Sequence, residues 1–414
     1  MTPHRNSVGY LALLRNGSVR ALLLGYFLNS FAVAYLIGYY LNITLASIGG
    51  PALLGLFATI NNVFAGILPV LAGAFSDLHG RKWVILTCVL SEGIGLAILA
   101  FIVPFKNTLV ILPAAMVTVA FMASSPVMVS LMGESAPRNA VGKAMSLLFL
   151  TNSVAGILSY LTFGSLVGAV GEHCLFLLSG FVVLGSFLFY LRVSETLKRN
   201  VVGGFSAQLG GMVKGIRLIK EPYLKLFMIY VCFEFFVSSI ASPFVPVFLR
   251  TVYSLSLSQI SWLYSAIGFV TLVGAFIAGY VVDRIGSLNS LILRDSLSVP
   301  FLLLFALAPF PSASLFLAVL AFIEQLNVAS SRYVVENTIP EHRGIVLGFR
   351  ASLARLSAVP APSVGAILWG FNPKTTFILP ALLTPVGIGI LLVLRKVRPL
   401  AVRPSGSEDL RKSF

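Results

Sequence analysis

Long apolar runs follow one another along almost the whole chain, and they restrict the possible fold more than any other feature. A helix needs about 20 consecutive apolar residues to cross the hydrocarbon core of a bilayer. Only 10% of the 414 residues are charged, whereas soluble domains carry about a quarter. The sequence therefore predicts an all-α membrane protein with twelve transmembrane helices, which cover residues 21–45, 52–75, 83–104, 108–131, 144–169, 173–193, 224–248, 260–282, 288–310, 313–333, 345–370 and 375–394.

The basic residues are distributed very unevenly between the two sides of these spans. Of the 29 Lys and Arg residues, only Lys106, Arg250 and Lys374 fall on one side, and Arg355 lies deep within a span. Because cytoplasmic connections collect Lys and Arg, we expect the richer side to face the cytoplasm, with both termini there and the protein in the cell membrane. The net charge of +15 then points to lipid headgroups as partners and not to nucleic acid.

A polar segment near the middle divides the chain into two halves of six spans each. We expect a first bundle over residues 1–193, a cytoplasmic linker over 194–222, a second bundle over 223–396 and a basic cytoplasmic tail over 397–414. Apolar residues from 209 to 219 of the linker recur at helical spacing between basic ones, which is typical of an amphipathic helix on a membrane surface. A mobile linker is the alternative.

Two motifs occur once in each half at nearly the same offset. "GAFSDLHGRK" starts at Gly73 and "GYVVDRIGSL" at Gly279, which are 206 positions apart. "ESAPRNAVGK" starts at Glu134 and "ENTIPEHRGI" at Glu336, which are 202 positions apart. Two independent motifs at similar offsets indicate a tandem duplication, so the two bundles should be pseudo-symmetric, an arrangement that is common in secondary transporters.

The first of these motifs resembles the loop between spans two and three of the major facilitator superfamily, which reads Gly-x-x-x-Asp-(Arg/Lys)-x-Gly-(Arg/Lys)-(Arg/Lys). The first copy departs from it at Leu78, and the second copy lacks the two terminal basic residues. The resemblance implies that family's fold and a latch that holds one conformational state, whereas ordinary cytoplasmic charge is the alternative reading. The predicted latch residues are Gly73, Asp77, Gly80, Arg81, Lys82, Glu134, Gly279, Asp283, Arg284, Glu336 and Arg343.

Ionisable side chains near the middle of a span cost roughly 3 kcal/mol or more and therefore need a partner or a purpose. Glu92, Glu234, Glu324 and Arg355 meet this test. The resemblance implies that spans 1, 4, 7 and 10 line a central cavity, with spans 3, 6, 9 and 12 outside. The substrate and proton candidates are therefore Glu234, Glu324, Asn29, Tyr35 and Tyr230.

The other mid-membrane groups receive structural roles. We expect Arg355 to form an internal ion pair, and a static pair with Arg355 is also the alternative role for Glu234 and Glu324. For Glu92 we expect a hydrogen bond within the first half, with Asn62 as its partner. The cavity spans carry no Arg or Lys at mid-depth, which argues against an organic-anion carrier.

An aromatic cavity with few fixed polar groups favours amphipathic or cationic compounds. Our first hypothesis is a monomeric, proton-coupled exporter of such compounds that works by alternating access. An uptake symporter for a neutral nutrient such as a sugar is the alternative. Catalytic triads, metal-ligand clusters and phosphate-binding Gly loops are not visible in the sequence, so we expect no enzyme, receptor, cofactor or metal. The expected partners are a small-molecule substrate, protons and membrane lipids.

Overall fold

The structure is a computed structural model that describes residues 9–118, 120–137, 139–196, 221–339 and 342–397. Over these residues the fold is entirely helical, and ten helical stretches are long and apolar enough to cross a membrane. The main helices are α1 (Tyr10–Arg15), α2 (Gly17–Tyr35), α3 (Leu41–His79), α4 (Arg81–Ile102), α5 (Thr108–Thr118), α6 (Ser125–Ser135), α7 (Val141–Leu191), α9 (Pro222–Ala241), α10 (Val245–Thr251), α11 (Leu257–Ile285), α12 (Ser287–Leu307), α13 (Ser312–Ile323), α14 (Val328–Glu336), α15 (Arg343–Ser357), α16 (Ala361–Phe371) and α17 (Thr375–Lys396).

The two longest stretches each contain two spans. The stretch Gly17–His79 bends at Gly50 (φ +67°), and Val141–Leu191 bends at Gly171 (φ +77°). Glycine takes a positive φ without the steric cost that a Cβ atom brings, so the chain can reverse direction at these points. Dividing the two stretches turns ten candidate helices into the twelve spans expected from the sequence.

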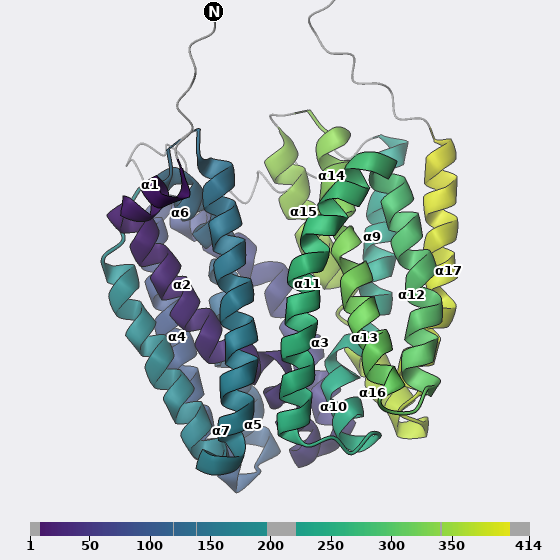
Figure 1. Cartoon of the computed structure of the whole chain (residues 1–414), viewed down its shortest axis with the longest axis horizontal. Coiled ribbons are helices and arrows are strands. Elements are labelled where there is room, and N and C mark those ends of the chain that lie inside the picture. The colour runs from purple at the N-terminus through teal and green to yellow at the C-terminus, as the bar shows by residue number, and fades with distance from the viewer. Residues whose placement is uncertain (1–8, 119, 138, 197–220, 340–341, 398–414) are drawn as a thin grey trace, which may run out of the picture.

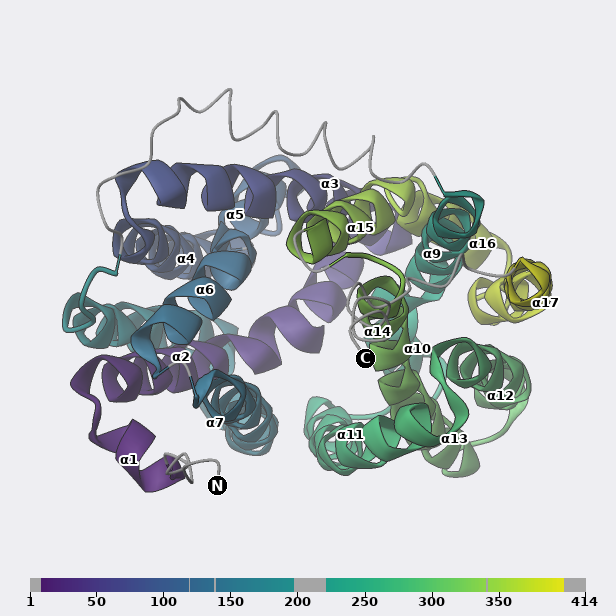
Figure 2. The same ribbon diagram turned by 90° about the horizontal axis from the view of Figure 1, so that it is seen from above.

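The helices stand in two groups, one from α1 to α7 and the other from α9 to α17 (Figures 1 and 2). In the first group α2 and α4 pack against α7, and in the second α9 and α12 pack against α17. The groups meet where α7 contacts α11 and where α3 contacts α15 and α16. The bundle boundaries drawn from the sequence stay a prediction, and most of the linker, with its amphipathic helix, and nearly all of the tail lie outside the described residues.

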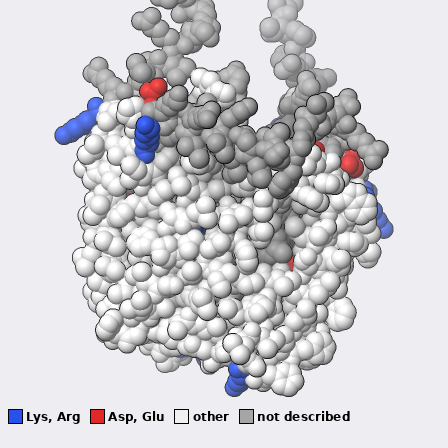
Figure 3. All heavy atoms as spheres, turned by 180° about the vertical axis from the view of Figure 1, so that it is seen from behind, with Lys and Arg blue, Asp and Glu red and all other residues white. Residues whose placement is uncertain are grey.

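The outer surface carries a broad band with almost no charge. Figure 3 shows Lys, Arg, Asp and Glu near the upper end of one face and only Lys or Arg at the lower end, with mostly uncharged side chains between them. Many large apolar side chains of the spans are exposed, including Phe276 (73% exposed), Phe181 (68%) and Trp262 (60%). Such exposure is costly in water but suits contact with lipid tails.

A cluster of tyrosines joins the two groups at one end of the molecule, which we call the opposite end because it lies away from the predicted latch. The ring of Tyr264 in α11 lies 4.9 Å from that of Tyr39 and 5.6 Å from that of Tyr160, between centroids. The Ser261 hydroxyl also donates a hydrogen bond to the backbone carbonyl of Tyr160. Toward the latch end, in contrast, a cavity of about 730 Å³ lies between α3 of the first group and α15 of the second.

The contact between α7 and α11 depends on a glycine. A Cβ atom on Gly164 would lie 1.7 Å from the Ser261 hydroxyl oxygen, so no side chain fits there. We expect Gly164→Leu to force the opposite end apart, because dense interiors do not absorb such an overlap. Spin labels at Val170→Cys and Trp262→Cys in a cysteine-free protein should report a longer distance. Gly168→Leu is the matched control, since its Cβ meets nothing within 4 Å; equal distances in both variants would contradict the prediction.

Candidate functional site

Spans one, four, seven and ten each contain a π or 3-10 turn, and these turns lie at equivalent places in the two halves. The π turn Leu36–Tyr40 in span one matches the 3-10 turn Ser242–Phe244 in span seven, and their first residues are 206 positions apart. The 3-10 turns Ala120–Ser124 and Glu324–Asn327 in spans four and ten begin 204 positions apart. Interrupted spans at corresponding places in a repeat mark the binding region of many transporters, and Glu324 starts one of these turns.

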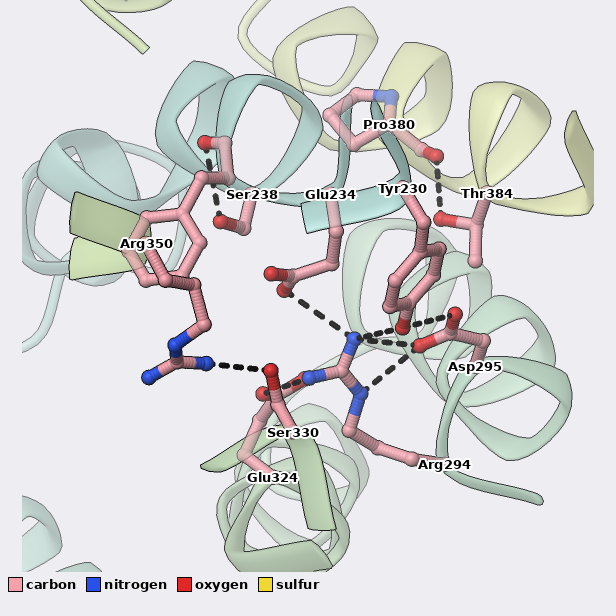
Figure 4. Close-up of polar contacts among 11 residues, drawn as sticks. Tyr230, Glu234, Ser238, Arg294, Asp295, Glu324, Ser330, Arg350, Pro380 and Thr384 are labelled. Carbon is pink, nitrogen blue, oxygen red and sulfur yellow. Dashed lines mark hydrogen bonds and ion pairs between the residues drawn. The ribbon is translucent and has the colours of Figure 1, made fainter. Parts of the chain in front are cut away.

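A buried guanidinium lies at the centre of the second group of helices. Arg294 of α12 is only 1% exposed, although it is a large charged residue. Its Nη2 atom lies 2.6 Å from Asp295 Oδ1, 3.3 Å from Glu234 Oε1 and 3.0 Å from the Tyr230 hydroxyl. A charge this deeply buried is stable only when ion pairs and hydrogen bonds replace its lost water, and three helical segments supply them (Figure 4).

The remaining members complete the network around Arg294. Its Nε atom donates to Asp295 Oδ1 at 2.8 Å, and the Tyr230 hydroxyl donates to Asp295 Oδ2 at 2.9 Å. Glu324 Oε2 lies 4.0 Å from Arg294 Nη1. The side chain of Glu324 is 48% exposed, whereas that of Glu234 is 17% exposed. Three carboxyl groups thus share one buried cation, and one of the three remains accessible.

This network forms the polar end of a cavity of about 330 Å³. The cavity lies among α9, α12, α13 and α17, and it is lined largely by apolar side chains. Glu234, Arg294, Asp295 and Glu324 all contribute to its wall. Concave, mostly apolar sites with a few converging polar groups are typical of small-molecule binding.

The structure brings Glu234 and Glu324 together, as their common assignment to the cavity predicts, but it corrects the identity of their partner. The cation is Arg294 and not Arg355. Within the described ranges Arg355 has no ion pair; its guanidinium lies 5.8 Å from the centroid of the Phe235 ring. The argument against an organic anion considered only spans 1, 4, 7 and 10, whereas Arg294 of span nine and Arg350 of span eleven each line a cavity.

Arg294 and Asp295 escaped prediction because they lie near the start of predicted span nine (288–310) and not near its middle, where charged groups were sought. Span nine was also expected on the outside of the bundle. A usable signal was present: the pair lies within the run "SLILRDSLSVPFLLL", with apolar residues on both sides. Adjacent opposite charges inside an apolar span indicate an internal network.

The first group of helices contains a smaller polar site. The amide of Asn29 donates to Glu92 Oε2 at 2.6 Å, and both residues line a cavity of about 390 Å³. Asn62, the expected partner of Glu92, donates instead to the carbonyl of Ala358 in the second group at 3.1 Å. Tyr35 is fully buried against neighbouring tyrosines, so its ring contacts protein on every side.

The predicted latch residues of the first half form a compact cluster around Arg81. Its Nη2 atom lies 2.8 Å from Glu134 Oε1 and 3.6 Å from Asp77 Oδ1. Glu195, which was not predicted, accepts hydrogen bonds from the backbone N–H groups of Arg81 and Lys82 at 3.2 and 3.0 Å. It therefore occupies the positive N-terminal end of α4.

The second half builds the same cluster with a different cation. Arg332 of α14 bonds to Asp283, and it pairs with Glu336 at 2.6 Å. Ser287, at the position equivalent to Arg81, donates to Glu336 Oε2 at 2.7 Å. The arginine and the serine have exchanged positions between the halves. Arg81 and Ser130 in the first half correspond to Ser287 and Arg332 in the second.

Four other predicted latch residues lie outside the ion pairs of these two clusters. Lys82 Nζ donates to the carbonyl of Leu191 at 2.6 Å, and Arg284 reaches only the hydroxyl of Tyr280 at 3.4 Å. Arg343 donates to backbone carbonyls of its own connection. Gly73 lines the 730 Å³ cavity with Asp77, opposite the start of α15.

The Major Facilitator Superfamily profile matches residues 22–330 and 227–414. A crystal structure of the nucleoside transporter NupG is 16% identical, covers 92% of this chain and 99% of its own, and has a TM-score of 0.76. The human organic anion transporter MFSD10 (TETRAN) is 17% identical, with coverages of 91% and 99% and a TM-score of 0.66. A bacterial homolog of the human lysosomal transporter Spinster, inward-facing and unoccupied, is 14% identical, with coverages of 92% and 96% and a TM-score of 0.67.

At these identities the structures show the shared fold alone. No curated protein sequence is significantly similar to the chain. The family profile indicates a transporter. Because the profile extends over most of both halves of the repeat, the chain belongs to the major facilitator superfamily.

Proposed function

We propose that this protein is a proton-coupled exporter of small amphipathic or cationic compounds that works by alternating access of its two groups of helices. The observation that carries the proposal is the network around Arg294, in which three carboxyl groups share one cation beside an apolar cavity. With all three ionised, the network holds two negative charges in excess. Burial makes such an excess costly unless a cation or a proton neutralises it.

Of the three carboxyl groups, Glu324 is the best placed to exchange a proton for a substrate cation. It is the most exposed carboxyl of the network and starts the irregular turn in span ten. The charged groups around it are Arg294, whose Nη1 atom lies 4.0 Å from Glu324 Oε2, and the acids Glu234 and Asp295, which line the same cavity. A proton and a substrate cation that compete for one carboxylate cannot occupy it together. Competition of this kind gives antiport, and an inward proton gradient then drives the cation outward.

An uptake symporter for a neutral nutrient is the second candidate, and the site in the first group of helices favours it. The Asn29 amide oxygen is buried without a hydrogen-bond partner, and Ser30 and Asn152 bond to each other at 2.9 Å in the same cavity. Uncharged donors and acceptors of this type suit hydroxyl-rich ligands. Both candidates place the protein in the cell membrane as a monomer with cytoplasmic termini.

One experiment distinguishes the two candidates by the direction of proton movement. The purified protein is reconstituted in liposomes with a pH-sensitive dye inside and presented with a panel of hydrophobic amines and sugars. An antiporter moves protons out of the liposome as the amine cation enters, so the internal pH rises faster than in protein-free liposomes, where only the neutral amine crosses and takes up a proton inside. A symporter carries protons in together with a sugar, so the internal pH falls. Compound flux that ignores an imposed pH gradient would refute both couplings.

We also propose that the cluster of Asp283, Arg332 and Glu336 acts as the predicted latch of the second half. Its cation should then be effective at position 332 or at position 287. Arg332→Ser removes the charge that joins Asp283 and Glu336, and we expect transport to slow by up to about fivefold, as for exposed ion pairs. Adding Ser287→Arg restores a guanidinium at the position that Arg81 holds in the first half, so the rate should recover. The double variant would remain as slow as Arg332→Ser if the cluster had no role as a unit.

A further inference from the structure

We infer that the 330 Å³ cavity is the seat of the transported cation, and that it binds a hydrophobic amine with a hydroxyl or carbonyl oxygen next to the ammonium group. The inference rests on the proposed function and narrows it to one place and one chemical class. The cavity lies wholly within the second group of helices. It shares no lining residue with the 730 Å³ cavity between the groups, so it is a pocket distinct from the central space.

Two buried polar atoms in this pocket lack a hydrogen-bond partner, although one of them, Arg294 Nη1, lies 4.0 Å from Glu324 Oε2. Arg294 Nη1 makes no hydrogen bond, although the residue is 1% exposed, and the Ser298 hydroxyl one turn along α12 makes none either. Both residues line the cavity. Buried polar groups in native proteins are nearly always paired, and an exception calls for a partner that the chain itself does not supply. A ligand oxygen accepting from both atoms would satisfy them.

The carboxyl groups of the pocket indicate that the ligand also carries a positive charge. Glu234 and Glu324 line the same wall as Arg294, and the single guanidinium leaves part of their charge unbalanced. An ammonium group between them would supply the missing positive charge and donate hydrogen bonds to both. Since Arg294 Nη1 lies 4.0 Å from Glu324 Oε2, the ammonium and the accepting oxygen of the ligand must be close neighbours.

The rest of the pocket suits a compact apolar body. Its wall away from the charges consists largely of aliphatic and aromatic side chains from four helices, including Val237, Ala241, Leu302, Phe305, Leu320 and Phe377. A volume of about 330 Å³ is at the small end of the range for ligand pockets, which begins near 300 Å³. One bicyclic ring system with a short amino-alcohol arm fits this description.

Binding of radiolabelled propranolol, a naphthyl amino alcohol, to the purified full-length protein tests the inference. Leu302→Trp fills the cavity without changing its charge, and we expect affinity to fall by at least about tenfold. Leu304→Trp is the matched control, because this residue of the same helix is 42% exposed and does not line the pocket. Wild-type affinity in Leu302→Trp would overturn the inference.

A second variant keeps the test decisive if Leu302→Trp fails to fold. Ser298→Ala removes one unpaired hydroxyl, and it should reduce the preference for propranolol over its analogue without the hydroxyl by about fivefold. An unchanged preference would contradict the predicted contact. The proposed function fails separately: propranolol that binds the wild-type protein but moves no protons across liposomes refutes the coupling and leaves the pocket intact. Propranolol-driven proton movement that persists in Leu302→Trp refutes the pocket and leaves the coupling intact.

Discussion

Replacing Arg294 with glutamine is expected to abolish transport and to lower the free energy of unfolding by about 3 to 5 kcal/mol. Arg294 lies between Asp295 and Glu234 at ion-pair distance and is almost completely buried. Without it, the remaining carboxyl groups face one another in a site with little water. Removing one partner of a buried ion pair is costly because it leaves the charge of the other partner uncompensated.

Thermal unfolding of the purified protein, followed by circular dichroism, measures the stability, and flux into liposomes measures transport. Arg355→Gln is the control, because Arg355 also lies within a span but contacts the Phe235 ring in place of a carboxylate, a contact that contributes only about 0.5 to 1 kcal/mol. Adding Asp295→Asn to Arg294→Gln removes one of the stranded charges and should restore part of the stability. Equal losses of stability and transport in Arg294→Gln and Arg355→Gln would contradict the prediction that Arg294 holds the network together.

Glu324→Gln is expected to eliminate proton-driven transport, while exchange of labelled for unlabelled compound continues with a weaker affinity, because Glu234 still binds the ammonium group. Glutamine resembles the protonated carboxyl in shape and hydrogen bonding but cannot gain or lose a proton. Glu324 is the accessible carboxyl of the network, so the substitution should uncouple the two fluxes without preventing the conformational change. Glu234, at 17% exposure and 3.3 Å from Arg294, is held in the ion pair, so Glu234→Gln should weaken substrate binding more than coupling.

Compound-triggered proton movement and counterflow exchange, measured in parallel on the same liposomes, separate these effects. Glu172→Gln provides the control, since Glu172 is an exposed acid in α7 of the other group of helices. Proton movement that persisted in both Glu234→Gln and Glu324→Gln would remove the two residues from the mechanism. Loss of exchange together with coupling in Glu324→Gln would assign this residue to binding alone.

The arrangement of spans was predictable because it follows from composition along the chain. Every span expected from an apolar run has a helical counterpart in the structure, since a lipid environment leaves helices as the only way to pair the backbone of a single crossing segment. The exchange of cation between Arg81 and Arg332 was not predictable. Ser287 was visible as a missing basic residue in the second motif, but its replacement comes from a different helix, α14.

The sequence by itself determined the membrane environment, the number of spans, the repeat and the position of Glu234 and Glu324 inside apolar spans, because these depend on local composition and periodicity. Only the tertiary structure decided which groups meet. Arg294 and Asp295 lie on α12, and their distance along the chain from Glu234 carries no information about contact. A buried charge is stable only where partners converge from several helices. Here that convergence depends on how α9, α12 and the turn at Glu324 pack together.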